Sequence, residues 1–130
     1  MSQPGSAIRT VVHDGSVSAI AFSADSTRFA SGGGGTKVLV RAVQTGPELD
    51  IPVNGFVSSI AFSPDGATLA LADLDRVATH SAGSGTLVWD GAIEAATSVN
   101  YVAFTPDGKQ LIATTDTRIA VLDAGTGAQI

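Results

Sequence analysis

One short phrase occurs three times in the chain, and it constrains the fold more than any other feature. It begins at Val17, Val57 and Val99, so successive copies are 40 and 42 residues apart. Each copy follows the pattern Val-x-x-Ile/Val-Ala-Phe-Ser/Thr-x-Asp. A repeat of this length corresponds to one four-stranded blade of a β-propeller, and the chain has room for three such blades.

The first six residues of each phrase predict a β-strand. Side chains alternate there with a period of two, and both faces of the alternation are nearly apolar. Such a strand is typical of the innermost position of a blade, where a neighbouring blade packs on each side. We therefore predict innermost strands over residues 17–22, 57–62 and 99–104. A buried helix is the alternative, but six residues are too few to form one.

A tight turn follows each of these strands. Ser63-Pro64-Asp65-Gly66 and Thr105-Pro106-Asp107-Gly108 place Pro and Gly where a hairpin turn favours them. In the first copy Ala24 and Ser26 replace the Pro and the Gly, which leaves Asp25 as the turn-forming residue. We expect this first turn to be the least rigid of the three.

The remaining strands of each blade are short segments bounded by Gly, Pro or Asp. We predict second strands over residues 28–31, 68–72 and 110–114, third strands over 37–43, 76–81 and 118–123, and fourth strands over 48–53 and 86–92. The fold class is therefore all-β, with propeller blades of four antiparallel strands in three repeats.

The start of the chain corresponds to the last strand of the repeat rather than to its first. Residues 1–7 form an expected flexible N-terminal segment, and residues 8–130 form the three-blade unit. Residues 8–13 precede the first innermost strand just as the fourth strands precede the second and third. We expect this segment to complete a last blade, in a ring closed by oligomerisation or as part of a larger propeller.

Charge and composition exclude several classes of partner. Seven basic residues against twelve acidic ones give a net charge of -5, which repels a phosphate backbone, so we expect no nucleic acid. The chain has no cysteine and therefore no disulfide or thiolate metal site. The first seven residues lack the features of a signal peptide, and no run approaches the roughly 18 apolar residues of a membrane span. We expect a cytoplasmic protein without membrane contact.

The repeated phrase, the blade length and the Thr/Ser-Gly step before each fourth strand resemble the WD-repeat family over residues 8–130. The resemblance implies a propeller that acts as an interaction scaffold. In that family a His before the innermost strand, a Ser or Thr, an Asp before the third strand and a Trp ending the third strand form a hydrogen-bonded network. TolB-like and lactonase-like propellers share the Phe-Ser-Pro-Asp-Gly phrase.

Only part of that network is present. His13 matches the family's His, and Asp116 matches its Asp in the third repeat, whereas Gly34 stands at the Asp position of the first repeat. The single Trp, Trp89, falls on a predicted fourth strand. The positions of the family's Trp hold Arg41, His80 and Leu122.

Side chains suited to catalysis or metal binding are sparse. The two histidines, His13 and His80, stand in different repeats and offer little material for a metal cage. The Gly-rich run over residues 32–37 is followed by a predicted strand rather than a helix, so it is interpreted as a flexible loop and not a phosphate site. Asp73 and Asp75 supply too few oxygens for a calcium loop. We expect no catalytic residue, no cofactor and no metal.

Two kinds of loop should meet at one rim of the propeller, as the resemblance to the WD-repeat family implies. These are the loops before the innermost strands and the loops before the third strands. They carry Asp14, Asp73, Asp75 and Asp116, and we predict that they form an acidic interaction surface. The candidate interaction rim consists of His13, Asp14, Phe56, Asp73, Asp75, Arg76, Asp116 and Arg118.

Two functions fit these features. The favoured one is a non-catalytic protein-protein interaction scaffold, an excised part of a larger bacterial signalling protein, which binds an unidentified protein or peptide. We also expect it to bind itself, as a dimer with six blades or a trimer with nine, because an end blade exposes a large apolar face. The alternative is a lactonase-like or TolB-like enzyme or small-ligand binder with its site in the central channel, for which His13 and Asp116 are the available donors.

Overall fold

The computed structural model describes residues 10–93 and 96–130. This part of the chain consists of strands and connecting loops, and it contains no helix that could span a membrane. The strands are β1 (Val17–Phe22), β2 (Arg28–Gly33), β3 (Lys37–Ala42), β4 (Leu49–Pro52), β5 (Val57–Phe62), β6 (Thr68–Asp73), β7 (Arg76–Ser81), β8 (Leu87–Ala92), β9 (Val99–Phe104), β10 (Gln110–Thr115) and β11 (Ile119–Asp123).

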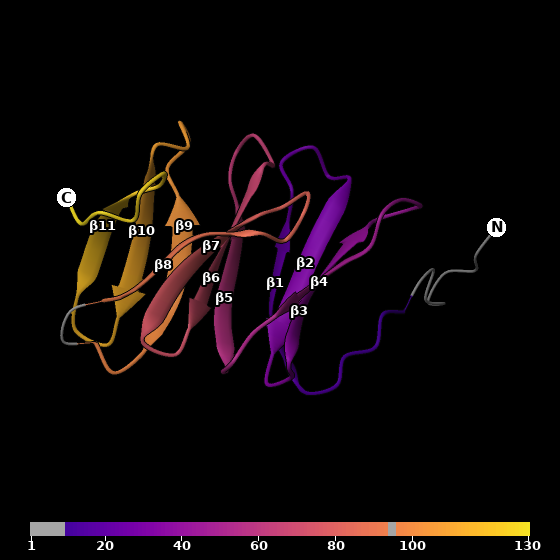
Figure 1. Cartoon of the computed structure of the whole chain (residues 1–130), viewed down its shortest axis with the longest axis horizontal. Helices are drawn as coiled ribbons and strands as arrows, with labels where there is room; N and C mark the ends of the chain where they lie inside the picture. Colours follow the sequence, from indigo (N-terminus) through magenta and orange to yellow (C-terminus); the bar gives the residue numbers. More distant parts are fainter. Residues whose placement is uncertain (1–9, 94–95) are drawn as a thin grey trace, which may run out of the picture.

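The strands form three antiparallel sheets that stand side by side as propeller blades (Figure 1). The first blade has the order β1-β2-β3-β4, the second β5-β6-β7-β8, and the third β9-β10-β11. A fourth strand begins beside β11, where Gln129 pairs with Leu122 and the Ile130 amide donates to the Val121 carbonyl at 2.8 Å. The three predicted innermost strands are confirmed to the residue, and the three blades form an open arc.

Neighbouring blades pack face to face along their innermost strands, β1 against β5 and β5 against β9. We call the side of a blade that faces the preceding blade its front face, and the opposite side its back face. In the second blade the front face carries Ile60, Phe62, Leu69 and Leu71, and the back face carries Ala61, Ala70, Ala72 and Val77.

Two apolar clusters hold the blades together, one at each junction. The first joins the back face of the first blade, with Ala30 and Val40, to Leu69 and its neighbours on the front face of the second. The second joins Ala70 and its neighbours to Leu111 on the front face of the third. Small residues on one side allow large ones on the other to approach closely, so both clusters exclude water.

Burial on both faces, expected for all three innermost strands, is correct only for the second blade. Ile20 on the front face of the first blade is 60% exposed, whereas Ile60 at the same position of the second is 6% exposed. Tyr101, on the back face of the third blade, is 69% exposed. The physical reason is that the first and third blades each have a neighbour on one side alone.

The turns after the innermost strands share one hydrogen-bonding scheme. Ser23 and Thr27 both donate to the Asp25 carboxylate, and the amide of Ser26 donates to the Ser23 carbonyl at 2.9 Å. The Thr27 amide, then the Thr27 hydroxyl, lower the pKa of Asp25 to about 2. In the first turn Ser26 replaces the Gly, yet it adopts a left-handed φ of 64°, close to the 75° of Gly66 in the second turn. The lower rigidity expected of the first turn stays a prediction.

The predicted strand over residues 8–13 lies partly outside the described residues, which begin at residue 10. Residues 10–13 pair with no sheet of their own chain. Val11 and His13 line a hollow with Val17 and Ile20 on the front face of the first blade. This is the side on which a preceding blade would stand, so the completion of a last blade by this segment stays a prediction.

Replacing Thr79 by Val should stabilise the fold. Thr79 is fully buried on the back face of the second blade, and its hydroxyl has no partner among the described residues. The same position holds Val40 and Val121 in the other two blades. Removing an unpaired buried hydroxyl should raise the free energy of unfolding by about 1–3 kcal/mol, measured by urea denaturation. The Thr79→Ser control keeps the hydroxyl and loses a methyl, so it should be less stable than the parent protein.

The Ser26→Gly change should also stabilise the protein, because Gly adopts a positive φ without the steric cost that Ser pays. The expected gain is about 0.5–1 kcal/mol in the same urea experiment. Ala24→Gly is the matched control in the same turn, where φ is not positive, and it should lower stability. A gain at Ala24 equal to that at Ser26 would contradict this account of the turn.

Candidate functional site

All eight residues of the candidate interaction rim lie at the same ends of their blades. The loops before β1 and β5 carry His13, Asp14 and Phe56. The connections from β6 to β7 and from β10 to β11 carry Asp73, Asp75, Arg76, Asp116 and Arg118, with Asp73 and Arg76 as terminal strand residues. Antiparallel strand order brings these two kinds of loop to one rim. Their role in binding stays a prediction.

In the first blade Asp14 ties the two loops together. Its carboxylate accepts hydrogen bonds from the Thr36 hydroxyl and, at 3.1 Å, from the Thr36 amide. These bonds, the hydroxyl first, hold the pKa of Asp14 below its ordinary value. A side chain at Gly35 would collide with the Asp14 carboxylate, and one at Gly33 with the Ser16 carbonyl. The Gly-rich run, interpreted above as a flexible loop, therefore permits close backbone packing.

In the second blade Asp73 sits in a partly buried position. Burial raises the pKa of its carboxyl, while Arg76 and the Asn54 amide act in the opposite direction. Arg76 also lies 3.5 Å from the Asp90 carboxylate on β8. Both side chains of this ion pair are about half exposed, so it contributes little to stability.

In the third blade Asp116 makes a much weaker contact than the WD-repeat network suggests. The hydroxyl of Thr97 lies 3.5 Å from its carboxylate, at the limit of a hydrogen bond. Asp14 in the first blade instead makes the short bonds that join two loops. The sequence analysis assigned Asp14 to the rim but did not predict its hydrogen-bond partner. The position of Thr36, directly after four glycines, was the feature that could have indicated that partner.

His13 and His80 occupy separate places in the structure. The His13 Nε2 atom lies 2.7 Å from the Ser31 hydroxyl, and the His80 Nδ1 atom lies 3.0 Å from the Gly85 carbonyl. A Ser–His contact can activate a nucleophile, but such a site needs a third group that orients the imidazole. The nearest carboxylate in sequence, Asp14, is bonded to Thr36 instead. The pair therefore ties the first loop to β2.

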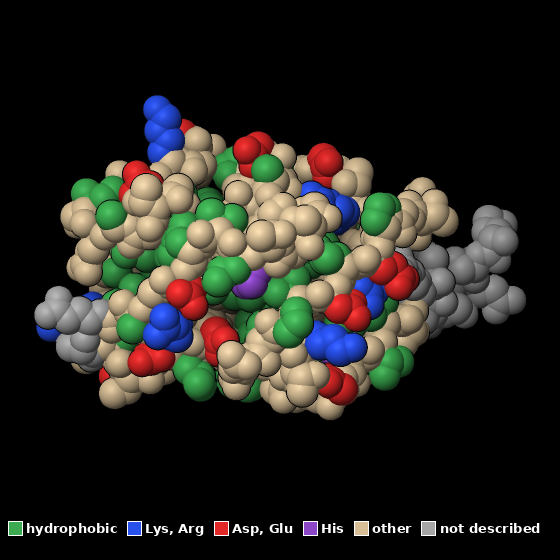
Figure 2. Space-filling model, in the orientation of Figure 1, with side chains coloured by type: hydrophobic (Ala, Val, Ile, Leu, Met, Phe, Trp, Pro, Cys, Tyr) green, Lys and Arg blue, Asp and Glu red, His purple; other side chains and the backbone are tan. Residues whose placement is uncertain are grey.

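The described residues offer no group of three or more His, Cys, Asp or Glu side chains arranged to hold a metal ion. Figure 2 shows acidic and basic side chains interspersed with apolar ones on the face toward the viewer, without a broad patch of one sign. Charged side chains of neighbouring strands also form pairs, such as Arg41 with Asp50 at 2.9 Å. This arrangement is typical of a solvated outer surface rather than a steering patch.

The family model described as "WD domain, G-beta repeat" matches residues 5–40, 49–79 and 85–123, which together make up most of the chain. The chain therefore belongs to the WD40 repeat family, whose members are generally interaction scaffolds without enzymatic activity. Each match begins ahead of an innermost strand and ends in a third strand, so residues before β1 occupy the place that β4 and β8 occupy in the other matches. No curated protein matches the chain.

Replacing Asp73 by Asn should stabilise the protein at neutral pH. The Asn side chain can still accept the Asn54 amide, while the charge that burial disfavours is removed. Because the folded-state pKa of Asp73 is raised, its effect on stability becomes unfavourable as the pH rises through that pKa. The gain from Asp73→Asn should therefore shrink as the pH falls toward 3.8, the ordinary value.

Thermal unfolding of Asp73→Asn and parent protein across this pH range measures the effect. Asp116→Asn changes the net charge equally at an exposed position of the same rim, so it serves as the control and should give a smaller gain. Equal gains from the two variants at every pH would trace the effect to net charge rather than to the burial of Asp73.

Proposed function

We propose that this chain is a non-catalytic interaction scaffold that assembles head to tail with copies of itself into a closed propeller. Two chains would give six blades and three chains nine. The observation that carries the proposal is the exposure of apolar positions that are buried elsewhere in the same chain. Ile119 on the back face of the third blade is 72% exposed, whereas Val77 at its position in the second blade is fully buried.

At one position each, the two uncovered faces differ in side-chain size from the covered ones. On the back face Tyr101 stands at the position that Ala19 and Ser59 hold in the other blades. On the front face of the first blade Ser31 stands where the second blade has Leu71. The Ser59 hydroxyl accepts a hydrogen bond from the Val102 amide across the junction at 3.1 Å, so this position lies at the contact. A large back-face residue and a small front-face residue favour a junction between third and first blades.

A hydrogen bond that occurs at both junctions also supports a junction between the third blade of one copy and the first blade of the next. Ser18 donates to the Val57 carbonyl at 3.1 Å, and Ser58 donates to the Val99 carbonyl at 2.6 Å. The third blade has Asn100 at this position, exposed and with an amide group able to donate. In the proposed assembly Asn100 donates to the Val17 carbonyl of the next copy.

The area of the contact is adequate for a stable assembly. A blade face about four strands wide at ~4.8 Å and ~18 Å tall presents roughly 350 Å². Each junction covers two faces, and a ring of two chains contains two junctions, so roughly 1,400 Å² is buried. This lies within the usual range of specific interfaces, about 1,200–2,000 Å².

The segment before β1 adds a second kind of contact to the proposed ring. Residues 10–13 precede β1 as β4 precedes β5, and the first family match includes them. We propose that they extend the strand that Gln129 begins beside β11 of the neighbouring copy. Strand addition of this kind covers an open sheet edge and fixes the register of the partner chain.

The candidate interaction rim is the proposed docking surface for a further protein or peptide. It combines an exposed aromatic ring at Phe56 with acidic groups and with Arg118, which suits a polar peptide carrying basic residues. A site in the central channel, as in a lactonase-like or TolB-like propeller, remains the alternative. Cytoplasmic location and origin in a larger bacterial signalling protein also stay predictions.

Light scattering tests the self-association. The expected mass is two or three times the 13.0 kDa of one chain, and Ile119→Lys should reduce it to that of one chain by placing a charge in the junction. Val88→Lys changes an apolar residue of the second blade that is 54% exposed, so it should leave the mass unchanged. A monodisperse monomer of the parent protein in dilute solution would refute the assembly.

A further inference from the structure

An arginine clamps the first junction at the rim opposite the candidate interaction rim. Arg28, at the start of β2, donates to the Ala82 carbonyl at 2.8 Å and to the Gly66 carbonyl at 2.6 Å. Its guanidinium carbon lies 5.5 Å from the centre of the Phe62 ring. The second blade therefore supplies a cage, an aromatic face and two carbonyl oxygens, that holds a guanidinium group from the first.

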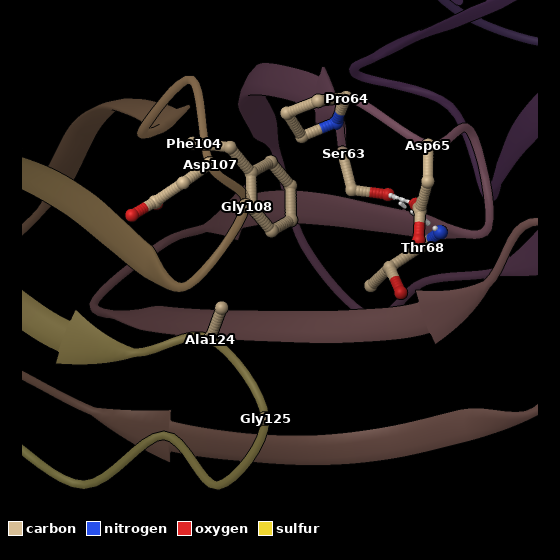
Figure 3. A pocket seen from close by; sticks show the side chains of 9 residues that line it. All are labelled: Ser63, Pro64, Asp65, Thr68, Phe104, Asp107, Gly108, Ala124 and Gly125. Carbon is tan, nitrogen blue, oxygen red and sulfur yellow. Dashed lines mark hydrogen bonds between the residues drawn. The ribbon is translucent and has the colours of Figure 1, made fainter.

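The second junction has the same cage without an arginine. Thr68 stands at the position of Arg28, while Phe104, Gly108 and Ala124 stand at the positions of Phe62, Gly66 and Ala82. Because the Thr side chain is short, a cavity of about 250 Å³ opens there (Figure 3). It is lined by Ser63, Pro64, Asp65, Thr68, Phe104, Asp107, Gly108, Ala124 and Gly125.

Part of the cage is available for a ligand. The Phe104 ring is partly exposed, and nothing among the described residues donates to the Gly108 carbonyl. The Ala124 carbonyl accepts a hydrogen bond from the Trp89 indole at 2.9 Å, so Trp89 replaces one of the two bonds that Arg28 makes in the first junction. Pro64 narrows one wall, its ring lying 3.4 Å from the point where a Cβ on Gly108 would stand.

The charge around the cavity favours a cation. Asp65 and Asp107 both line it, and Figure 3 shows the Asp65 carboxylate bonded to Ser63 at the end opposite Asp107. Asp25, which corresponds to Asp65, has the positive charge of Arg28 among the causes that lower its pKa. Asp65 has no cationic group among the causes of its lowered pKa. Lys109 is among the causes that lower the pKa of Asp107, so it is the Asp65 end of the cavity that lacks a cation.

We propose that this cavity binds a guanidinium group, supplied by an arginine side chain of a partner protein or by a small guanidinium compound. A planar guanidinium stacks on the Phe104 ring and donates to the Gly108 carbonyl, as Arg28 does with Phe62 and Gly66. A lysine ammonium lacks the planar face and binds more weakly. The site lies within one chain, so it does not depend on ring closure, and it gives the proposed scaffold a defined chemical specificity.

Titrations followed by amide NMR test the site. The probes are ethylguanidinium and a capped Gly-Arg-Gly peptide, with ethylammonium and capped Gly-Lys-Gly as controls. Saturable shifts of the Gly108 amide are expected with the guanidinium probes and at least about fivefold weaker binding with the ammonium ones. If the peptide binds as well as ethylguanidinium, the guanidinium group is supplied by an arginine side chain of a protein. If ethylguanidinium alone binds, the ligand is a small guanidinium compound. No saturable shift with either guanidinium probe overturns the proposal.

Two variants give each junction the residue that the other junction has at the equivalent position. Thr68→Arg places an internal guanidinium in the cavity, so it should abolish binding of the probes. Arg28→Thr opens the equivalent cavity at the first junction and should create a second site, with saturable shifts at the Gly66 amide and a raised Tm in ethylguanidinium. Neither residue lies on the uncovered end faces, so the mass by light scattering should stay unchanged. Undiminished binding by Thr68→Arg, or no new site in Arg28→Thr, would overturn the assignment.

Discussion

The face-to-face contact between neighbouring blades is the interaction on which the rest of the structure depends. A single blade of this size cannot bury its own apolar side chains, because both of its faces are largely apolar. The second blade solves this by lying between two others, with Leu69 and Leu71 covered on one side and Ala70 and Val77 on the other. The stacking also aligns equivalent turns and loops, which places the rim residues and the arginine cage at regular intervals.

Because the chain contains three copies of one unit, equivalent positions in the three blades can be compared with one another. When three copies of one unit differ in a single side chain, the change in environment is traceable to that side chain or to the missing neighbour. Ile20 and Ile60 are the same residue at the same position, and they differ only because one has a blade in front of it. Thr79 and Val40 show the opposite case, since both are buried on a covered back face and only the side chain differs.

The sequence predicted the repeating elements well, because they depend on local patterns. The innermost strands were placed to the residue by alternation of apolar side chains bounded by turn residues, and all three blades follow from them. Contacts between repeats were not predictable in the same way. The bond from Asp14 to Thr36 and the clamp from Arg28 to Gly66 join residues 22 and 38 positions apart, and no period or composition encodes such pairs. The positive φ of Ser26 was not predictable from the residue type, because the left-handed conformation is unfavourable for a residue that carries a Cβ.

A repeat fold of this kind can produce a binding site by the loss of a side chain. The cage around Arg28 consists mostly of backbone carbonyls and an aromatic ring, which the fold generates at each junction irrespective of the residue that fills it. At the second junction Thr68 leaves the cage partly empty, and Trp89 satisfies one carbonyl while the other stays open. The first junction has Leu49 at the Trp89 position, a side chain that cannot donate, so there both carbonyls depend on the arginine. Arg28 thus fills the cage at the first junction, whereas at the second junction an aromatic ring and a carbonyl oxygen stay available for a ligand.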